Sequence, residues 1–134
     1  MIRVKIVPKD SNKVAKVIII RDDGCVLMLK RSNYVDKYAG EWDLPGGHIQ
    51  VGEDFVVGMR REVKEETNLD IKNYTFVDNI DNLNFYHSSY PENSGQSIKL
   101  SHEHTEFKFF QKKDLDPLGK FEKMALKALE MRND

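Results

Sequence analysis

Short apolar runs separated by polar turns predict several β-strands along the chain. Residues 13–20 alternate weakly and end in four consecutive aliphatic residues, and residues 25–30 form a second apolar run. The turn between them, residues 21–24, ends in Asp-Gly, a pair that favours a tight hairpin. Further strands are predicted over residues 71–80, 83–86 and 107–110. The chain is therefore expected to open with a β-hairpin and to return to strands after residue 70.

Two segments repeat apolar residues at spacings of three and four, which predicts helices. The first begins at Asp54 and places Phe55, Met59 and Val63 on one side. The second covers residues 120–131, where we interpret the apolar stripe as core packing; the stripe consists of Phe121, Met124, Ala125, Ala128 and Leu129. The order of two strands, a helix, three strands and a helix indicates a mixed α+β fold.

The remaining segments are polar and predict loops over residues 32–40, 87–96 and 111–119. The loop at 87–96 is long for a compact domain, so we expect it to be either mobile or facing a substrate.

Composition limits the classes of function. At 134 residues, with 40% hydrophobic and 32% charged residues, the chain is expected to be one soluble domain covering residues 1–134. The net charge of −1 argues against non-specific coating of nucleic acid, and no apolar run is long enough to span a membrane. Cys25 is the single cysteine and lies in an apolar run, so we expect a core residue. With no secretion signal in residues 1–5, a cytoplasmic location is expected.

Three glutamates of the first predicted helix, Glu62, Glu65 and Glu66, stand at positions i, i+3 and i+4. Like charges at this spacing repel by about 0.2–0.5 kcal/mol per pair, so a bound cation is expected beside them. Carboxylates are ligands that Mg²⁺ accepts together with water and phosphate oxygens. The alternative is an ordinary solvated helix face. Gly58, one turn before Glu62, is interpreted as leaving room for a metal and a substrate.

The spacing of the whole segment 47–69 favours the metal site over the solvated face. Gly47 is followed after five residues by Glu53, and after seven more by the run Arg61-Glu62-Val63-Lys64-Glu65-Glu66-Thr67, with Leu69 beyond. This segment resembles the Nudix box of the Nudix hydrolases. Asn68 replaces the family's glycine, at a position that ends the helix in a left-handed conformation, which asparagine also tolerates.

The resemblance implies a Nudix-type α/β/α sandwich, with a mixed sheet between helices, over nearly the whole chain. It also implies that Glu62 and Glu66 are metal ligands, that Glu65 is a ligand or the general base, and that the backbone carbonyl of Gly46 helps to hold the metal. The cofactor would be Mg²⁺ or Mn²⁺. Arg61 would form an ion pair that orients a glutamate, most plausibly Glu53.

The approach to the box, Trp42-Asp43-Leu44-Pro45-Gly46-Gly47-His48, also resembles Nudix sequences. Lys30 and Arg31 stand where many members place cations that face phosphate or base, and with Gly47 they are candidate substrate contacts; two solvated charges are the alternative. Trp42 is interpreted as a core anchor rather than a wall under a base. His48 is a weaker catalytic candidate, because the carboxylates are already present.

A second informative run, Leu100-Ser101-His102-Glu103-His104, has an aromatic residue three positions later. It resembles the matching segment of diadenosine tetraphosphate hydrolases within the Nudix family, where Glu103 would be a further metal ligand or base. The two histidines lack the other ligands of a closed zinc site, which makes zinc an unfavoured alternative.

These features predict metal-dependent hydrolysis of a diphosphate linkage in a nucleoside diphosphate derivative: a dinucleoside polyphosphate, a nucleotide sugar such as ADP-ribose, or a nucleoside triphosphate. Two alternatives stay open. One is a nucleotide sensor without hydrolytic activity, and the other is a pyrophosphohydrolase of RNA 5′ caps, although no dense basic tract indicates nucleic-acid binding. A homodimer is plausible from the family resemblance.

Overall fold

A computed structural model of the protein describes residues 9–33 and 38–132. Residues 1–5, on which the absence of a secretion signal rests, lie outside the described residues, as do residues 34–37 of the predicted loop. Seven strands and two α-helices are present in this part of the chain, with one short 3₁₀ helix: β1 (Lys9–Ile20), β2 (Val26–Arg31), β3 (Trp42–Asp43), β4 (Gly46–Gln50), α1 (Phe55–Thr67), β5 (Thr75–Ile80), β6 (Leu83–Ser89), β7 (His104–Phe110), η1 (Lys112–Asp114) and α2 (Lys120–Arg132).

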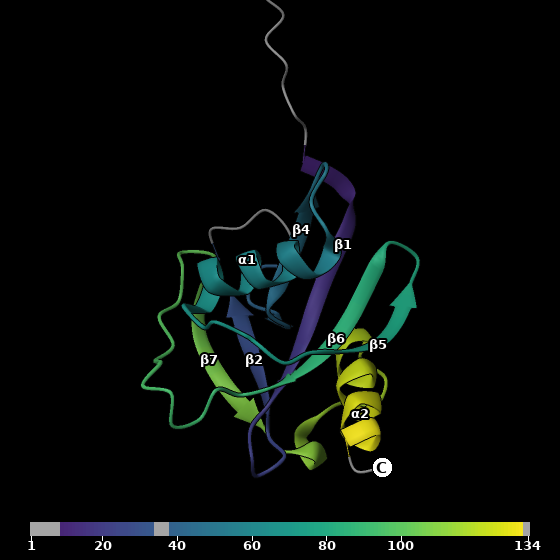
Figure 1. Cartoon of the computed structure of the whole chain (residues 1–134). Helices are drawn as coiled ribbons and strands as arrows, with labels where there is room; N and C mark the ends of the chain where they lie inside the picture. Colours follow the sequence, from purple (N-terminus) through teal and green to yellow (C-terminus); the bar gives the residue numbers. More distant parts are fainter. Residues whose placement is uncertain (1–8, 34–37, 133–134) are drawn as a thin grey trace, which may run out of the picture.

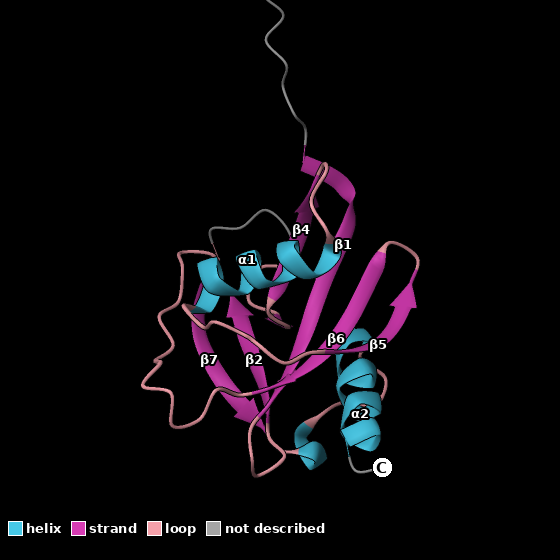
Figure 2. Ribbon diagram, viewed as in Figure 1, coloured by secondary structure: helices cyan, strands magenta, loops and turns pink. Residues whose placement is uncertain are grey.

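The strand β1 is the centre of a mixed sheet. It pairs antiparallel with β4 on one side and parallel with β6 on the other, and β5 pairs antiparallel with β6. The hairpin predicted at residues 21–24 joins β1 to β2 through the pair Ile20 and Val26. The strand β2 then pairs antiparallel with β3 and β7. The two helices lie against this sheet, as Figures 1 and 2 show.

Alternation along β1 creates two separate cores, one beneath each helix. Ile18 and Ile20 belong to the core that includes α2, whereas Val17 and Ile19 belong to the core that includes α1. Successive side chains of a strand point to opposite faces, so a strand that is apolar at every position is covered on both. The predicted sandwich of helix, sheet and helix is therefore confirmed.

The ends of α1 follow from local chemistry. The side chain of Asp54 accepts a hydrogen bond from the backbone N–H of Val56 at 2.9 Å, which caps the first turn. Asn68 has a φ of 69°, and its N–H donates to the carbonyl of Lys64 at 2.9 Å. The asparagine therefore ends the helix in the left-handed conformation that its sequence position predicts.

Several boundaries differ from those predicted from the sequence. The strand β4 was not predicted, because its two glycines conceal the alternation of a short strand. The strand β6 extends to Ser89, into the predicted loop at 87–96, because His87, Ser88 and Ser89 pair with the end of β1. The strand β5 begins only at Thr75, and β7 begins earlier than predicted, at His104. Hydrogen bonding to a buried neighbouring strand thus extends the sheet through polar residues.

No helix in residues 9–33 and 38–132 combines the length and the apolar character that crossing a membrane requires.

Candidate active site

The helix α1 presents two buried glutamates toward β4. Glu62 is 8% exposed and Glu66 is 4% exposed, although both side chains carry carboxylates. The backbone N–H of Gly46 donates a hydrogen bond to Oε1 of Glu66 at 2.8 Å. This bond joins the segment before the box to the last turn of α1.

Two adjacent glycines make this close approach possible. Gly46 has a φ of +126°, and a side chain there would overlap the carbonyl oxygen of Ala15 on β1. At Gly47 a Cβ atom would lie 2.7 Å from Oε2 of Glu62. The first glycine therefore permits the pairing of β4 with β1, and the second leaves the space that the Glu62 carboxylate fills.

Gly58 has a different role from the one predicted. A Cβ atom at Gly58 would lie 2.6 Å from Cδ1 of Ile49 and 2.7 Å from Oε1 of Glu53. The space that we interpreted as room for a metal and a substrate is filled by these two side chains. Gly58 allows α1 to pack closely against β4 and the segment that follows it.

Arg61 connects three glutamates of the box, Glu53, Glu62 and Glu65. Its guanidinium donates to both carboxylate oxygens of Glu53, at 2.8 and 3.1 Å, and to Oε1 of Glu62 at 3.1 Å. It also lies 3.3 Å from both oxygens of Glu65 and 3.1 Å from the carbonyl of His48. Hydrogen bonding to Arg61 lowers the pKa of Glu53. The side chain of Glu65 is 59% exposed, so it lies at the solvent edge of this network.

A pocket of about 650 Å³ brings six of the predicted site residues together: Arg31, Gly46, Gly47, Glu62, Glu66 and Glu103. Glu53, Arg61 and Glu65 do not line it, and neither does Lys30. The ammonium of Lys30 instead lies 3.9 Å from Glu106 on the neighbouring strand β7. Of the two predicted basic substrate contacts, only Arg31 faces the pocket.

The buried Glu66 has the most strongly perturbed acidity in this pocket. Burial raises its pKa to about 8, and the nearby carboxylates of Asp43 and Glu62 act in the same direction. The charge of Lys16 and the hydrogen bond from Gly46 oppose the increase. A carboxylate in this position accepts a proton near neutrality unless a cation binds beside it.

Sequence reasoning missed a buried ion-pair network in the same pocket. The ammonium of Lys16 donates to Oδ2 of Asp43 at 3.2 Å and to the carbonyls of Leu44 at 3.2 Å and Gly46 at 3.3 Å. Arg31 also donates to Oδ2 of Asp43, at 3.3 Å. Burial opposes ionisation of Asp43, but Lys16 and its other partners bring the pKa of the carboxyl down to about 2. A lysine within the apolar half of β1, between Ala15 and Val17, was the available sequence indication.

The histidines do not form a metal centre with the carboxylates. His48 lines the pocket, and His102 is exposed. His104 is buried, with Nε2 3.9 Å from Oδ2 of Asp43, and neither ring nitrogen has a hydrogen-bond partner. Within the described ranges, no three side chains of His, Cys, Asp or Glu form a ready-made metal site.

Trp42 packs against the core, the role predicted for it. Its ring packs edge-on against Phe110, with centroids 5.0 Å apart, and the residue joins the core beneath α2. It also lines the pocket that contains Glu62 and Glu66.

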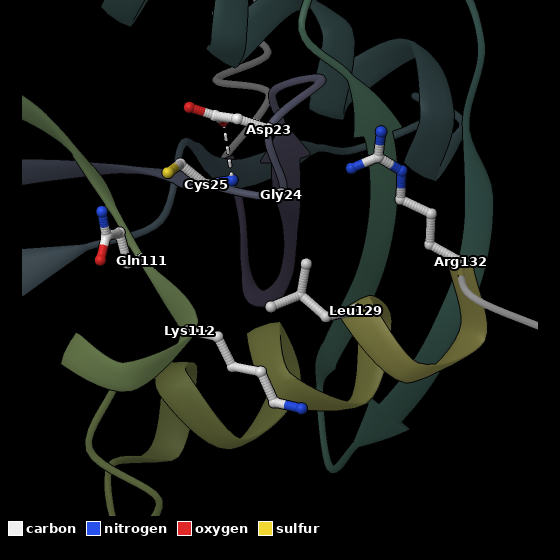
Figure 3. A pocket seen from close by; sticks show the side chains of 7 residues that line it. All are labelled: Asp23, Gly24, Cys25, Gln111, Lys112, Leu129 and Arg132. Carbon is white, nitrogen blue, oxygen red and sulfur yellow. Dashed lines mark hydrogen bonds between the residues drawn. The ribbon is translucent and has the colours of Figure 1, made fainter.

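A second pocket, of about 340 Å³, lies between the β1–β2 turn and the end of α2 (Figure 3). It contains none of the predicted catalytic or metal-binding residues. Cys25, which lines it, is only 6% exposed, and burial raises the pKa of its thiol. The residue therefore fits the predicted role in the core rather than that of a reactive thiolate.

Comparison with known proteins identifies the family. The family model described as the NUDIX domain matches residues 11–124, which is most of the chain. The chain belongs to the Nudix family. The matched residues include the box and the Glu103 segment, as well as the strands that frame them, so the resemblance inferred from the sequence is confirmed.

Curated Nudix relatives match part of the chain. The nucleoside triphosphatase NudI of Salmonella schwarzengrund is 37% identical over 67 residues, 46% of this chain and 48% of that protein. The corresponding protein of Salmonella arizonae is 36% identical over the same length. The match thus spans about half the length of the curated relatives.

Solved structures support the fold over a longer stretch. A crystal structure of an ADP-ribose pyrophosphatase from Streptococcus suis has a TM-score of 0.73 at 23% identity, over 90% of this chain and 91% of that one. A C. elegans Ap4A hydrolase has a TM-score of 0.64 at 23% identity, over 90% and 97%. At these identities the likeness establishes the Nudix fold alone.

Nudix hydrolases generally use divalent metal ions, and the donors in the pocket suit such an ion. Glu62, Glu66 and Glu103 would supply carboxylate oxygens and Gly46 a backbone carbonyl, although among the described residues these groups are not gathered into a ready-made site. Hard divalent cations prefer oxygen ligands of these kinds. The buried carboxylate of Glu66, whose pKa is raised to about 8, is also a group that a bound cation would stabilise in its ionised form.

Proposed function

We propose that the chain is a Nudix hydrolase that cleaves a diphosphate linkage in a nucleoside diphosphate derivative and requires Mg²⁺ or Mn²⁺. The observation that carries the proposal is the pairing of two buried glutamates, Glu62 and Glu66, in one pocket with Gly46 and Glu103. Burying carboxylates is costly unless they are paired or bind a metal. Glu62 is paired with Arg61, whereas Glu66 accepts a backbone hydrogen bond from Gly46. Because the chain belongs to the Nudix family, a metal-assisted hydrolase is the function that best explains this arrangement.

Glu62, Glu66 and the carbonyl of Gly46 would hold the metal. A bound divalent cation would neutralise charge on phosphate oxygens and lower the pKa of a bound water. Glu103 is our candidate for the group that accepts the water's proton, because it lines the pocket and lies in the loop before β7, outside α1. Glu65 is less suited to this task, since its exposed carboxylate contacts Arg61.

Arg61 and Glu53 would act as positioning residues. Arg61 binds Glu53, Glu62 and Glu65 at once, so it fixes the side of α1 that faces β4. The hydrogen bond from Arg61 would orient the carboxylate of Glu62, a proposed metal ligand. Supporting contacts of this kind are frequent around metal sites. Neither Arg61 nor Glu53 needs to touch the substrate.

Arg31 is the proposed phosphate contact. It lines the pocket together with the carboxylates, and its planar guanidinium can donate two parallel hydrogen bonds to two oxygens of a phosphate group. The named relatives include a nucleoside triphosphatase, an ADP-ribose pyrophosphatase and an Ap4A hydrolase. Our substrate proposal therefore keeps three classes: nucleoside triphosphates, nucleotide sugars and dinucleoside polyphosphates.

The test is a screen of purified protein for phosphate release from these three classes, coupled to a phosphatase where the product is a monoester. Each substrate is assayed with Mg²⁺, with Mn²⁺ and with EDTA. Glu62→Gln is compared with Glu106→Gln, a matched change at an exposed glutamate of β7. We expect metal-dependent turnover of one class, lost by at least about 100-fold in Glu62→Gln and retained in Glu106→Gln.

Full activity in a folded Glu62→Gln variant would refute the assignment. If no substrate is turned over but nucleotides bind, the nucleotide sensor becomes the better description. If neither turnover nor nucleotide binding is found, capped RNA is assayed next. Its hydrolysis would select the cap pyrophosphohydrolase, which uses the same chemistry on a longer substrate.

A further inference from the structure

The carboxylate of Asp43 lies in the wall of the pocket and accepts hydrogen bonds at both oxygens. The backbone N–H of Leu44 donates to Oδ1 at 2.8 Å, and the ammonium of Lys16 donates to Oδ2 at 3.2 Å. Asp43 is only 4% exposed, and Lys16 lines the pocket beside it. Bonds at both oxygens restrict rotation of the carboxylate, so its position is well defined.

Lys16 anchors Asp43 to the centre of the sheet. An ammonium has three N–H donors, and this one contacts three acceptors: Asp43 and the carbonyls of Leu44 and Gly46, the last two at 3.2 and 3.3 Å. Lys16 belongs to the central strand β1, where it stands opposite Gly46 in the pairing with β4. Asp43 is therefore held by its own segment and by the middle of the sheet.

The same carboxylate holds Arg31, the proposed phosphate contact. The guanidinium donates to Oδ2 of Asp43 at 3.3 Å, and the side chain is 20% exposed where it lines the pocket. The backbone N–H of Arg31 also donates to the carbonyl of Glu41 at 2.8 Å. A guanidinium has five N–H donors in one plane, so one arginine can bind a carboxylate along one edge and a phosphate along another. The bond to Asp43 can thus determine which edge faces the pocket.

Neither stability nor charge alone explains this pair well. Removing charged groups from water costs free energy that attraction within a buried ion pair often only offsets, so such pairs contribute little net stability. A carboxylate beside a phosphate contact also repels the phosphate. An arginine that is oriented before the substrate arrives, however, loses less conformational entropy when it binds.

We propose that Asp43 is a positioning residue that holds the guanidinium of Arg31 in the orientation for binding the phosphates of the substrate. This inference rests on the proposed function, because it concerns the phosphate contact of the same site. Asp43 itself needs no contact with the substrate. Its effect on binding must therefore pass through Arg31, which separates it from a residue that only stabilises the fold.

The test is a double-mutant cycle on ligand binding. The probe is methylenediphosphonate, a diphosphate analogue whose P–C–P bridge is not hydrolysed, titrated by calorimetry into the full chain with Mg²⁺. Asp43→Asn, Arg31→Met and the double variant are compared with the wild type. We expect Asp43→Asn alone to weaken binding by at least about tenfold, but by less than about twofold when Arg31 is already replaced. In steady-state kinetics with the substrate from the screen, the loss should appear mainly in KM.

Two further variants keep the test decisive. Asp70→Asn is the matched control, because it breaks an exposed pair with Arg60 at 3.1 Å, outside the pocket, and should change binding by less than about twofold. Asp43→Asn leaves Lys16 buried without its carboxylate, so the same cycle is repeated with Lys16→Met added, which removes both buried charges. This combination should weaken binding of the probe as Asp43→Asn does.

Equal losses with and without Arg31 would show that Asp43 acts through the fold, and would overturn the inference. Tighter binding in Asp43→Asn would reduce Asp43 to a repelling charge, and would overturn it as well, as would a wild type that does not bind the probe. Turnover of a substrate in any of these cases leaves the hydrolase intact. Coupled losses of probe binding without turnover of any substrate would refute the hydrolase and keep the role of Asp43.

Discussion

The guanidinium of Arg61 forms two hydrogen bonds with the carboxylate of Glu53, at 2.8 Å to Oε2 and 3.1 Å to Oε1. The two residues are separated by two turns of helix, and the pair fixes the segment before α1 against the helix itself. Because Arg61 also contacts Glu62, the geometry of a buried carboxylate depends on this pair. Arg61 therefore connects the segment before α1 to a glutamate of the pocket.

Loss of the Arg61–Glu53 pair should reduce both turnover and stability. We expect Arg61→Ala to lower kcat by about 100-fold, because Glu62 loses the group that orients it, and to lower the free energy of unfolding by about 1.5–3 kcal/mol. Steady-state kinetics and urea denaturation measure the two effects. Arg60→Ala, which removes an exposed ion pair with Asp70, is the matched control and should change both quantities little. Equal losses in the two variants would contradict the role assigned to Arg61.

The raised pKa of Glu66 predicts that metal binding depends on pH. A divalent cation must displace the proton that Glu66 holds below about pH 8. The association constant should therefore rise about tenfold per pH unit from pH 6 toward pH 8 and level off above it. Titration calorimetry with Mn²⁺ in buffers of different ionisation enthalpy should detect close to one proton released per ion at pH 6.5. An affinity that is flat across this range would show that metal binding does not displace a proton from Glu66.

The same group affects the stability of the metal-free protein, with the opposite trend. The folded-state pKa of Glu66, about 8, lies above its ordinary value of 4.5, so the folded state binds the extra proton between these two values. Its contribution to stability is complete below pH 4.5 and is lost as the pH rises through 8. We expect the free energy of unfolding of Glu66→Gln to fall less than that of the wild type as the pH rises over this range. Chemical denaturation at intervals from pH 5 to pH 8 in EDTA, with Glu65→Gln as control, measures it.

The two adjacent glycines should respond differently to alanine. In Gly47→Ala the new methyl group would meet the Glu62 carboxylate, which can rotate away, so we expect a loss of metal affinity and kcat with a change in stability of less than about 1 kcal/mol. In Gly46→Ala the methyl group would meet the backbone of β1, which cannot yield. That variant should unfold more easily, by about 2 kcal/mol or more. Melting curves and Mn²⁺ titrations of both variants separate the effects.

The asparagine that ends α1 should act mainly on stability. Asn68→Ala places an alanine at a φ of 69° and should cost about 1 kcal/mol or more, whereas Asn68→Gly should change the free energy of unfolding by less than about 1 kcal/mol in either direction. Neither change should alter kcat by more than about twofold, because the residue lies outside the pocket. A tenfold loss of turnover in Asn68→Gly would mean that the position affects the chemistry.

Local features of the fold were predictable from the sequence because they depend on neighbouring residues. The capping aspartate, the left-handed Asn68 and the carboxylate strip of α1 all lie within one continuous segment, where helical spacing fixes their relations. The tight turn before Cys25 was predictable for the same reason. Burial on both faces of β1 also followed directly from its run of aliphatic residues.

Contacts between residues of different strands were not predictable in this way. Lys16 reaches Asp43 only because β1 and β4 pair in a register that sets Lys16 opposite Gly46, and no local pattern specifies that register. The packing of Gly58 against Ile49 depends on the same alignment of β4 with α1. A glycine in a sequence indicates a close approach but does not identify what approaches, and here it was a side chain rather than a ligand.

The parallel pairing of β1 with β6 has a consequence for the order of folding. It joins Val14 to Leu83, positions 69 residues apart in the sequence, and it continues to the pair of Ile20 with Ser89. Contacts between such distant segments form slowly, because the intervening loop must close first. During synthesis the whole of the box emerges from the ribosome before β6 does. Glu62 and Glu66 are thus synthesised before β1 can gain β6 as its partner along that edge.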